Sequence, residues 1–131
     1  MAKCKSKSKT ILIVEDEKPL LDAISIKMQK SGYETVSART VEQALNYLND
    51  IQKIDVIWLD HYLLGKGSGL DFLVRIKESE DYKNIPVFVV SNTASHDKIA
   101  SYLNLGAVKF YVKAEKRLDE IINDINEYVT N

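Results

Sequence analysis

The sequence predicts an α/β fold in which a parallel sheet is covered by helices on both faces. Five short apolar runs alternate with five segments of helical periodicity along the 131 residues of the chain. The runs do not alternate between apolar and polar residues, which is typical of strands that are buried on both faces. A closed barrel of eight such units would need nearly twice this length. We therefore expect an open, doubly wound (βα)5 sheet of the flavodoxin-like kind, with strand order 2-1-3-4-5.

The first half of the chain is predicted to contain two strand–helix units. Pro19 suits the first turn of one helix, Gly32 supplies the left-handed cap that ends it, and Thr40 is a good N-cap for the next helix. The predicted elements are strands at residues 10–14 and 33–38 and helices at residues 19–31 and 41–48.

Three further units are predicted in the second half. Pro86 is tolerated because it stands at the start of a strand, and Gly106 ends a helix. A loop with three glycines, residues 65–69, separates the third strand from its helix. The predicted elements are strands at residues 54–59, 87–90 and 108–112 and helices at residues 70–77, 95–105 and 115–129.

Composition and charge indicate a soluble protein of the cytoplasm. Apolar residues make up 45% and charged residues 28% of the chain, close to the averages for globular domains. The single cysteine, Cys4, cannot form an internal disulfide, and no apolar run approaches the roughly 18 residues needed to span a bilayer. Residues 1–9 carry four lysines and are predicted to be a flexible basic leader. The rest of the chain has 14 of the 18 basic residues and all 19 acidic residues, so its net charge is negative, which argues against nucleic-acid binding.

Polar side chains follow four of the predicted strands at their carboxyl ends, where ligands collect in such sheets. They are Glu15 and Asp16 after the first strand, Asp60 after the third, Ser91 after the fourth and Lys113 after the fifth. Each acid taken alone fits a helix cap or a solvated turn equally well. Asp60, however, ends an apolar run at the centre of the predicted sheet, and three converging carboxylates are the hard oxygen ligands that suit Mg²⁺.

In this order and spacing the motifs resemble a response regulator receiver domain, and the resemblance covers residues 10–130. It is carried by Ile11-Leu-Ile-Val-Glu-Asp-Glu17, Asp55-Val-Ile-Trp-Leu-Asp60, Pro86-Val-Phe-Val-Val-Ser91 and Gly106-Ala-Val-Lys-Phe-Tyr-Val-Lys113. The resemblance implies that residues 10–131 form a receiver domain and that Asp60 is its phosphoacceptor. It also implies a Mg²⁺ site and two groups that bind the phosphoryl oxygens. The metal ligands would be Glu15, Asp16, Asp60 and the backbone carbonyl of Tyr62, and the phosphoryl ligands would be Ser91 and Lys113.

The resemblance further implies a switch and a set of partners. The phosphoryl group would come from a histidine kinase or a phosphotransfer protein, and the domain would catalyse its own phosphorylation and dephosphorylation. Ser91 would then move toward the phosphoryl group while Phe110 turns inward, and the surface of the fourth helix, fifth strand and fifth helix would change its binding to a downstream protein. We expect a stand-alone receiver, and a homodimer through that surface is compatible with the sequence.

Several positions depart from the family pattern. Leu64 and Ala114 each stand where the family commonly has proline, and the loop of residues 65–69 is one residue longer than usual. Asn92 replaces a small residue and would either narrow access to Asp60 or hydrogen-bond phosphate. Tyr62 and Thr93 occupy positions that flank the path of hydrolytic water, so a bulky Tyr62 would shield an aspartyl phosphate.

Three alternatives remain open at this point. The first is a receiver-like interaction module without phosphotransfer, which the altered loop, Asn92 and Ala114 would fit. The second is an Mg²⁺-dependent aspartyl phosphohydrolase, although His61 and Tyr62 stand where its second acidic residue would be needed. The third is a flavin-binding domain of the same architecture, which is disfavoured because acids follow the first strand instead of a phosphate-binding loop.

Overall fold

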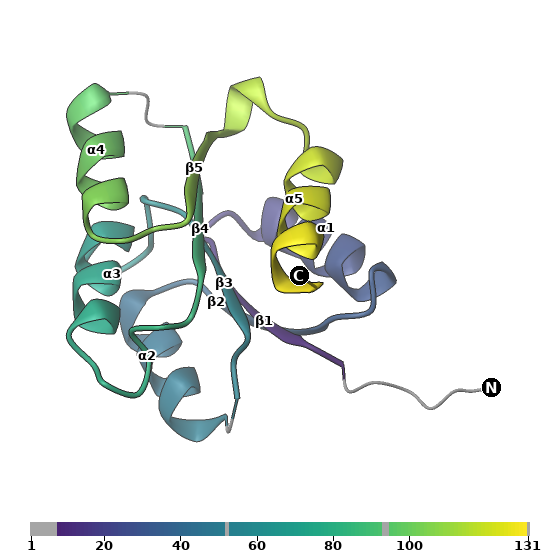
Figure 1. Ribbon diagram of the computed structural model, residues 1–131, viewed down its shortest axis with the longest axis horizontal. Helices are drawn as coiled ribbons and strands as arrows, with labels where there is room; N and C mark the ends of the chain where they lie inside the picture. Colours follow the sequence, from purple (N-terminus) through teal and green to yellow (C-terminus); the bar gives the residue numbers. More distant parts are fainter. Residues whose placement is uncertain (1–7, 52, 93–94, 131) are drawn as a thin grey trace.

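The computed structural model describes residues 8–51, 53–92 and 95–130. A five-stranded parallel sheet stands at the centre of the molecule, in the order β2-β1-β3-β4-β5, and helices flank it on both sides (Figure 1). This confirms the predicted fold class and strand order. Most of the predicted leader, residues 1–7, lies outside the described residues, and so does Thr93.

The ten main elements alternate along the chain as predicted. The strands are β1 (Thr10–Val14), β2 (Glu34–Ala38), β3 (Val56–Leu59), β4 (Val87–Ser91) and β5 (Lys109–Val112). The helices are α1 (Lys18–Lys30), α2 (Val41–Asp50), α3 (Gly69–Lys77), α4 (His96–Asn104) and α5 (Leu118–Thr130), with a 3₁₀ turn at Lys113–Glu115.

Two apolar cores lie on opposite faces of the sheet. Helices α2, α3 and α4 cover one face and α1 and α5 cover the other, as Figure 1 shows. Successive strand residues enter different cores because their side chains point to opposite faces: Ile57 packs on the α2–α4 side and Trp58 on the α1–α5 side. Both residues are fully buried. The apolar strand runs of the sequence are therefore explained by helices on both faces.

The strand register brings the polar strand ends together. Val14 pairs with Leu59 across β1 and β3, and Ser91 pairs with Val112 across β4 and β5. The residues that follow leave the sheet at the same edge. The backbone N–H of Asp60 still donates to the carbonyl of Val14 at 2.9 Å, which holds the start of this loop against the sheet.

The start of the last helix differs from the prediction. We placed it at Glu115, which was wrong: the chain makes a 3₁₀ turn there, Lys116 is extended, and α5 begins at Leu118. The N–H of Arg117 donates to the side chain of Glu120 at 3.1 Å, which caps the first turn. The helical periodicity of the apolar residues was real, but it did not reveal the turn that carries Lys113 toward the sheet edge.

The third strand is also shorter than predicted, starting at Val56 rather than residue 54. Asp55, just before the strand, is bonded twice to Thr10: its carboxylate accepts from the backbone N–H of Thr10 at 2.8 Å, and its own N–H donates to the carbonyl of Thr10 at 2.8 Å. In the described part of the chain, none of the helices is both long and apolar enough to cross a membrane.

Candidate functional site

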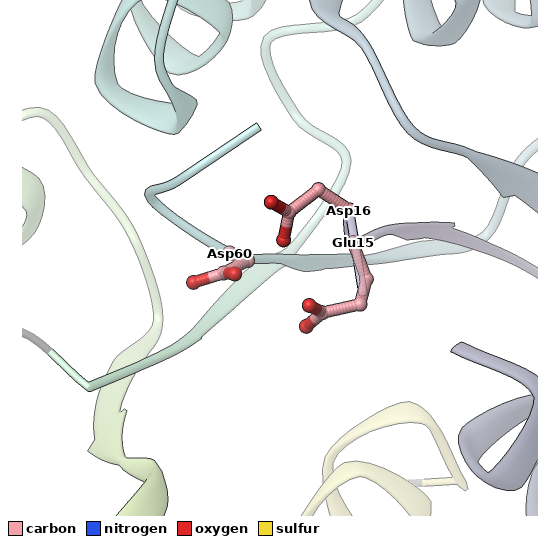
Figure 2. A group of neighbouring side chains, drawn as sticks. All are labelled: Glu15, Asp16 and Asp60. Atoms are coloured by element: carbon pink, nitrogen blue, oxygen red, sulfur yellow. The ribbon is translucent and has the colours of Figure 1, made fainter. Parts of the chain in front are cut away.

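Three carboxylates converge at the carboxyl edge of the sheet, at the ends of β1 and β3. One oxygen each of Glu15, Asp16 and Asp60 lies within 4.8 Å of the others, and Figure 2 shows the three side chains grouped around the end of β3. Glu15 and Asp60 are buried, with 0% and 2% of their surface exposed, while Asp16 is half-buried. Hard oxygen donors at this spacing form a site that can bind a metal ion.

Lys113 provides the positive charge of the site. Its Nζ lies 3.1 Å from Oε1 of Glu15 and 3.3 Å from Oδ2 of Asp60, so one ammonium group pairs with both buried acids. Burial by itself would lower the pKa of Lys113, but the charges of Asp60 and Glu15 outweigh it and the pKa is raised. The lysine therefore stays protonated and can attract a further anion.

Among the three acids of the cluster, Glu15 has a raised pKa. Burial, followed by the nearby charge of Asp60, raises its pKa to about 7, and the attraction of Lys113 only partly opposes this shift. Although Lys113 is close to Oε1 of Glu15, this oxygen accepts no hydrogen bond from the described residues. A divalent cation would satisfy this oxygen and relieve the repulsion between the acids.

Both oxygens of the Asp60 carboxylate have assigned partners. The backbone N–H of His61 donates to Oδ1 at 2.7 Å, and Oδ2 faces the ammonium of Lys113. The carboxylate is thus held in one orientation at the sheet edge. Such a preoriented oxygen is suited to attack an electrophile that the nearby positive charge holds in place.

The other predicted residues surround this centre unequally. Ser91 is buried at the end of β4, whereas Asn92 is exposed in the loop that follows. The side chain of Tyr62 is 54% exposed, and its ring lies edge-on to that of His61. Phe110 is half-buried on β5, with its ring centroid 5.5 Å from that of Tyr102.

The glycine-rich loop after Asp60 is tied to the neighbouring elements. Gly65 and Gly67 adopt φ values of +71° and +93°, which few other residues tolerate. The N–H of Leu64 donates to the carbonyl of Arg39 at 3.0 Å, and the Ser68 side chain caps α3. These contacts fix the shape of the loop beside the site.

Arg39 was not singled out from the sequence. Its guanidinium donates two hydrogen bonds, of 2.9 and 2.6 Å, to the backbone carbonyl of Asp16. Because Arg39 also accepts the hydrogen bond from Leu64, it joins the acidic loop after β1 to the loop after Asp60. No local pattern indicates a contact between residues that are 23 positions apart.

His61 and Tyr102 were also missed. Nδ1 of the buried His61 ring lies 2.6 Å from the hydroxyl oxygen of Tyr102 on α4, and Nε2 lies 3.2 Å from Nζ of Lys98. Tyr102 is fully buried. The only sequence signal was the position of His61 directly after Asp60, and nothing linked it to a helix 41 residues away.

The fold and this site agree with the family comparison. The family model of the response regulator receiver domain matches residues 11–126. The chain belongs to this family, whose members act as phosphoacceptor domains in two-component signalling.

Known proteins similar to this chain include a regulator and two solved structures. The phosphate regulon transcriptional regulatory protein PhoB of Pseudomonas aeruginosa is 34% identical over 105 residues, or 80% of this chain and 45% of that protein. The phosphorylated cyanobacterial phytochrome response regulator RcpA is 27% identical, with a TM-score of 0.85 over 95% of this chain and 96% of that one. The Mn²⁺-bound form of response regulator Rcp1 is 25% identical, with a TM-score of 0.80 over 92% and 93%. The chain spans less than half the length of PhoB.

We predict that Gly69→Ala displaces the backbone of Asp60. A Cβ at this first position of α3 would clash with the backbone oxygen of Asp60 and lie 2.8 Å from the hydroxyl of Tyr102. The end of β3 must then shift, so the free energy of unfolding should fall by about 1–3 kcal/mol and the amide NMR shifts of Asp60 and His61 should move. Gly32→Ala is the control, because an added Cβ there has no atom within 4 Å and only the positive φ is unfavourable. In this control the amide shifts of Asp60 and His61 should not change. Unchanged stability in Gly69→Ala would contradict the close approach.

The raised pKa of Glu15 predicts a stability that falls with pH in metal-free protein. The protonated form is favoured in the folded state, so this contribution is complete below the ordinary value of 4.5 and is lost as the pH rises through about 7. As the pH rises between these limits, the free energy of unfolding of the wild type should fall by up to about 3 kcal/mol relative to that of Glu15→Gln. Urea unfolding in EDTA at several pH values measures the difference. Parallel pH profiles for the two proteins would rule out the shifted carboxyl.

Proposed function

We propose that this protein accepts a phosphoryl group on Asp60 from a histidine kinase or a phosphotransfer protein and thereby switches its binding to a downstream protein. The convergence of Asp60 with Glu15, Asp16 and Lys113 carries the proposal. A buried, preoriented carboxylate beside a lysine is the arrangement that phosphoryl transfer to an acid requires. Membership in the receiver family supports the same conclusion.

The proposed metal is Mg²⁺, held by Glu15, Asp16, Asp60 and the backbone carbonyl of Tyr62. The donor set fits, because all of these ligands are oxygens and the three carboxylates are already close together. The Glu15 oxygen without a hydrogen bond is a ready ligand. The Mn²⁺-bound structure of the similar Rcp1 supports a divalent cation here. When bound, the ion would neutralise the charge of the incoming phosphoryl group.

In the proposed reaction an oxygen of Asp60 attacks phosphorus in line with the bond to the donor. The new oxygen–phosphorus bond forms while the donor bond breaks, and the electron pair of that bond leaves with the donor. Lys113 balances the charge on the phosphoryl oxygens, and the Ser91 hydroxyl donates to one of them. The N–H of His61 keeps the carboxylate aligned throughout.

The proposed switch links Ser91 to Phe110. Once the phosphoryl group is attached, movement of Ser91 would open space for the Phe110 ring, which now lies between the sheet and Tyr102. Phenylalanine has no hydroxyl, so the switch would rest on packing alone. The surface of α4, β5 and α5 would then bind the downstream protein or a second copy of the chain. Sedimentation of the protein alone, with and without an acyl-phosphate mimic, distinguishes a homodimer from a monomer that awaits another partner.

We further propose that residues 10–131 are the signalling unit and that it works in the cytoplasm, where its kinase partner would be found. The family match to residues 11–126 and the lone Cys4 support this. The negative charge of this unit supports protein partners rather than nucleic acid. Western blotting of fractionated cells tests the location.

The contacts around His61 disfavour the phosphohydrolase alternative. Such an enzyme needs a second acid or base beside the nucleophile, and His61 is the nearest candidate by position. Its two ring nitrogens are engaged by Tyr102 and Lys98, and the ring is buried. An engaged and buried ring is poorly placed to protonate a leaving group.

A titration with Mg²⁺ and beryllofluoride, which mimics the acyl phosphate, tests the proposed function. Trp58 is fully buried two residues before Asp60, so its fluorescence should change saturably in the wild type and not in Asp60→Asn. Incubation with acetyl phosphate should add the mass of one phosphoryl group to the wild type alone. Asp22→Asn is the matched control, because that exposed acid pairs with Lys18 on α1, and it should respond like the wild type.

Two results would contradict the proposed function. A silent wild type in both assays would favour the interaction module without phosphotransfer, provided that thermal unfolding shows the protein to be folded. An equal response in Asp60→Asn would place the acceptor elsewhere.

We predict that Tyr62 prolongs the life of the aspartyl phosphate. Its ring packs edge-on against His61, the residue after the acceptor, with 54% of the side chain exposed, and from there it would obstruct the approach of water. Tyr62→Asn should therefore speed dephosphorylation by at least about threefold, as measured by loss of the phosphoryl mass with time. Tyr128→Asn is the control, since Tyr128 is a 51% exposed tyrosine on α5. Equal lifetimes in the wild type and Tyr62→Asn would exclude shielding by the ring.

A further inference from the structure

The residue after the phosphoacceptor is held at three points. The backbone N–H of His61 donates to Oδ1 of Asp60 at 2.7 Å, and its carbonyl accepts from the N–H of Gly69 at 2.8 Å. The ring forms the third contact, with Nδ1 at 2.6 Å from the hydroxyl oxygen of Tyr102. The first contact orients the acceptor carboxylate, and the other two determine where that N–H points.

The direction of the ring hydrogen bond follows from Lys98. An ammonium group can only donate, so the nitrogen that faces Lys98 at 3.2 Å, Nε2, is the acceptor. An Nε2 that accepts a hydrogen bond carries no proton, so the ring is neutral. A neutral imidazole then carries its proton on Nδ1 and donates it to the oxygen of Tyr102. The hydroxyl oxygen of Tyr102 accepts this hydrogen bond with a lone pair.

We propose that Tyr102 is a positioning residue for phosphoryl transfer, which acts through His61 to hold the Asp60 carboxylate in its reactive orientation. This inference rests on the proposed function of Asp60. It names a residue outside the four sequence motifs that carried the family resemblance. Tyr102 comes from α4, so a helix on one face of the sheet determines the geometry of a site whose charged groups follow β1, β3 and β5.

The mechanical argument concerns the peptide between Asp60 and His61. Without the Tyr102 hydroxyl, the buried Nδ1–H of His61 loses its partner and the ring must turn or shift to find another. The peptide N–H moves with the ring, and Oδ1 of Asp60 loses its alignment. A displacement of the attacking oxygen lowers the rate of transfer. Asp60 is also one of the proposed Mg²⁺ ligands, but Glu15 and Asp16 keep their places on the loop after β1 and continue to hold the ion. The rate should therefore suffer more than the affinity for Mg²⁺.

The test compares two buried tyrosines whose hydroxyls are both hydrogen-bonded. Tyr102→Phe removes the hydroxyl and keeps the ring, including its packing against Phe110. Tyr33→Phe is the matched control: its hydroxyl donates a 2.7 Å hydrogen bond to Asn126, and Tyr33 stands before β2, at the opposite end of the strands. Tyr102→Phe should lower the rate of phosphorylation by acetyl phosphate about fivefold to tenfold and the Mg²⁺ affinity by less than about threefold. Tyr33→Phe should change neither.

Rescue at position 61 separates positioning from packing. In His61→Asn the side-chain amide nitrogen can take the place of Nδ1 and donate to Tyr102, whereas His61→Leu offers similar bulk and no donor. The asparagine variant should phosphorylate at least about threefold faster than the leucine variant. Equal rates in these two variants, or an equal loss in Tyr102→Phe and Tyr33→Phe, would overturn the proposal.

A second measurement keeps this inference apart from the proposed function. Hydrogen exchange of the His61 amide reports its bond to Asp60 directly, and it should quicken about tenfold in Tyr102→Phe and stay unchanged in Tyr33→Phe. If the wild type is never phosphorylated, the proposed function fails while the exchange rates still judge the positioning. An unchanged His61 amide in Tyr102→Phe would overturn the positioning role even in a protein that is phosphorylated normally.

Discussion

The ion pairs of Lys113 with Glu15 and Asp60 are the interaction on which the site depends. Two buried carboxylates at the end of a sheet repel each other and lose hydration, and one ammonium group only partly compensates them. The remaining strain makes the site receptive to a cation, and a phosphoryl group in turn needs both positive charges. The sheet supplies this arrangement because parallel strands end at one edge, where the register places Glu15 and Asp60 directly after two adjacent strands.

The fold could be predicted from the sequence because its signals are local. Apolar runs, caps such as Thr40 and glycines such as Gly32 each act within a few residues, and the alternation of strands and helices leaves few topologies. The same reasoning misplaced the start of α5, because the largely charged residues 113–117 carry no apolar pattern that would separate a 3₁₀ turn from the first turn of a helix. The turn contains Lys113, whose side chain pairs with Glu15 and Asp60, and contacts between residues so distant in the sequence leave no local signal.

The charged centre of the site was predictable for a similar reason, since Asp60 and Lys113 are the residues that end their apolar strands. The supporting contacts were not. Arg39 reaches the carbonyl of Asp16, and Tyr102 reaches His61, across separations that depend on how helices pack on the sheet. Arginine and tyrosine are common on helices and loops, so residue type alone does not mark them. Only the packed structure distinguishes a supporting residue from an ordinary one.

The acceptor carboxylate is therefore held from two sides by different physical means. Oδ2 faces Lys113 in a 3.3 Å ion pair that an incoming cation or phosphoryl group will weaken or replace. Oδ1 is held by a short backbone hydrogen bond whose position depends on neutral groups, the ring of His61 and the hydroxyl of Tyr102. Charge changes during phosphoryl transfer act strongly on the first contact and weakly on the second. A site that must change its charge without losing its alignment benefits from this division.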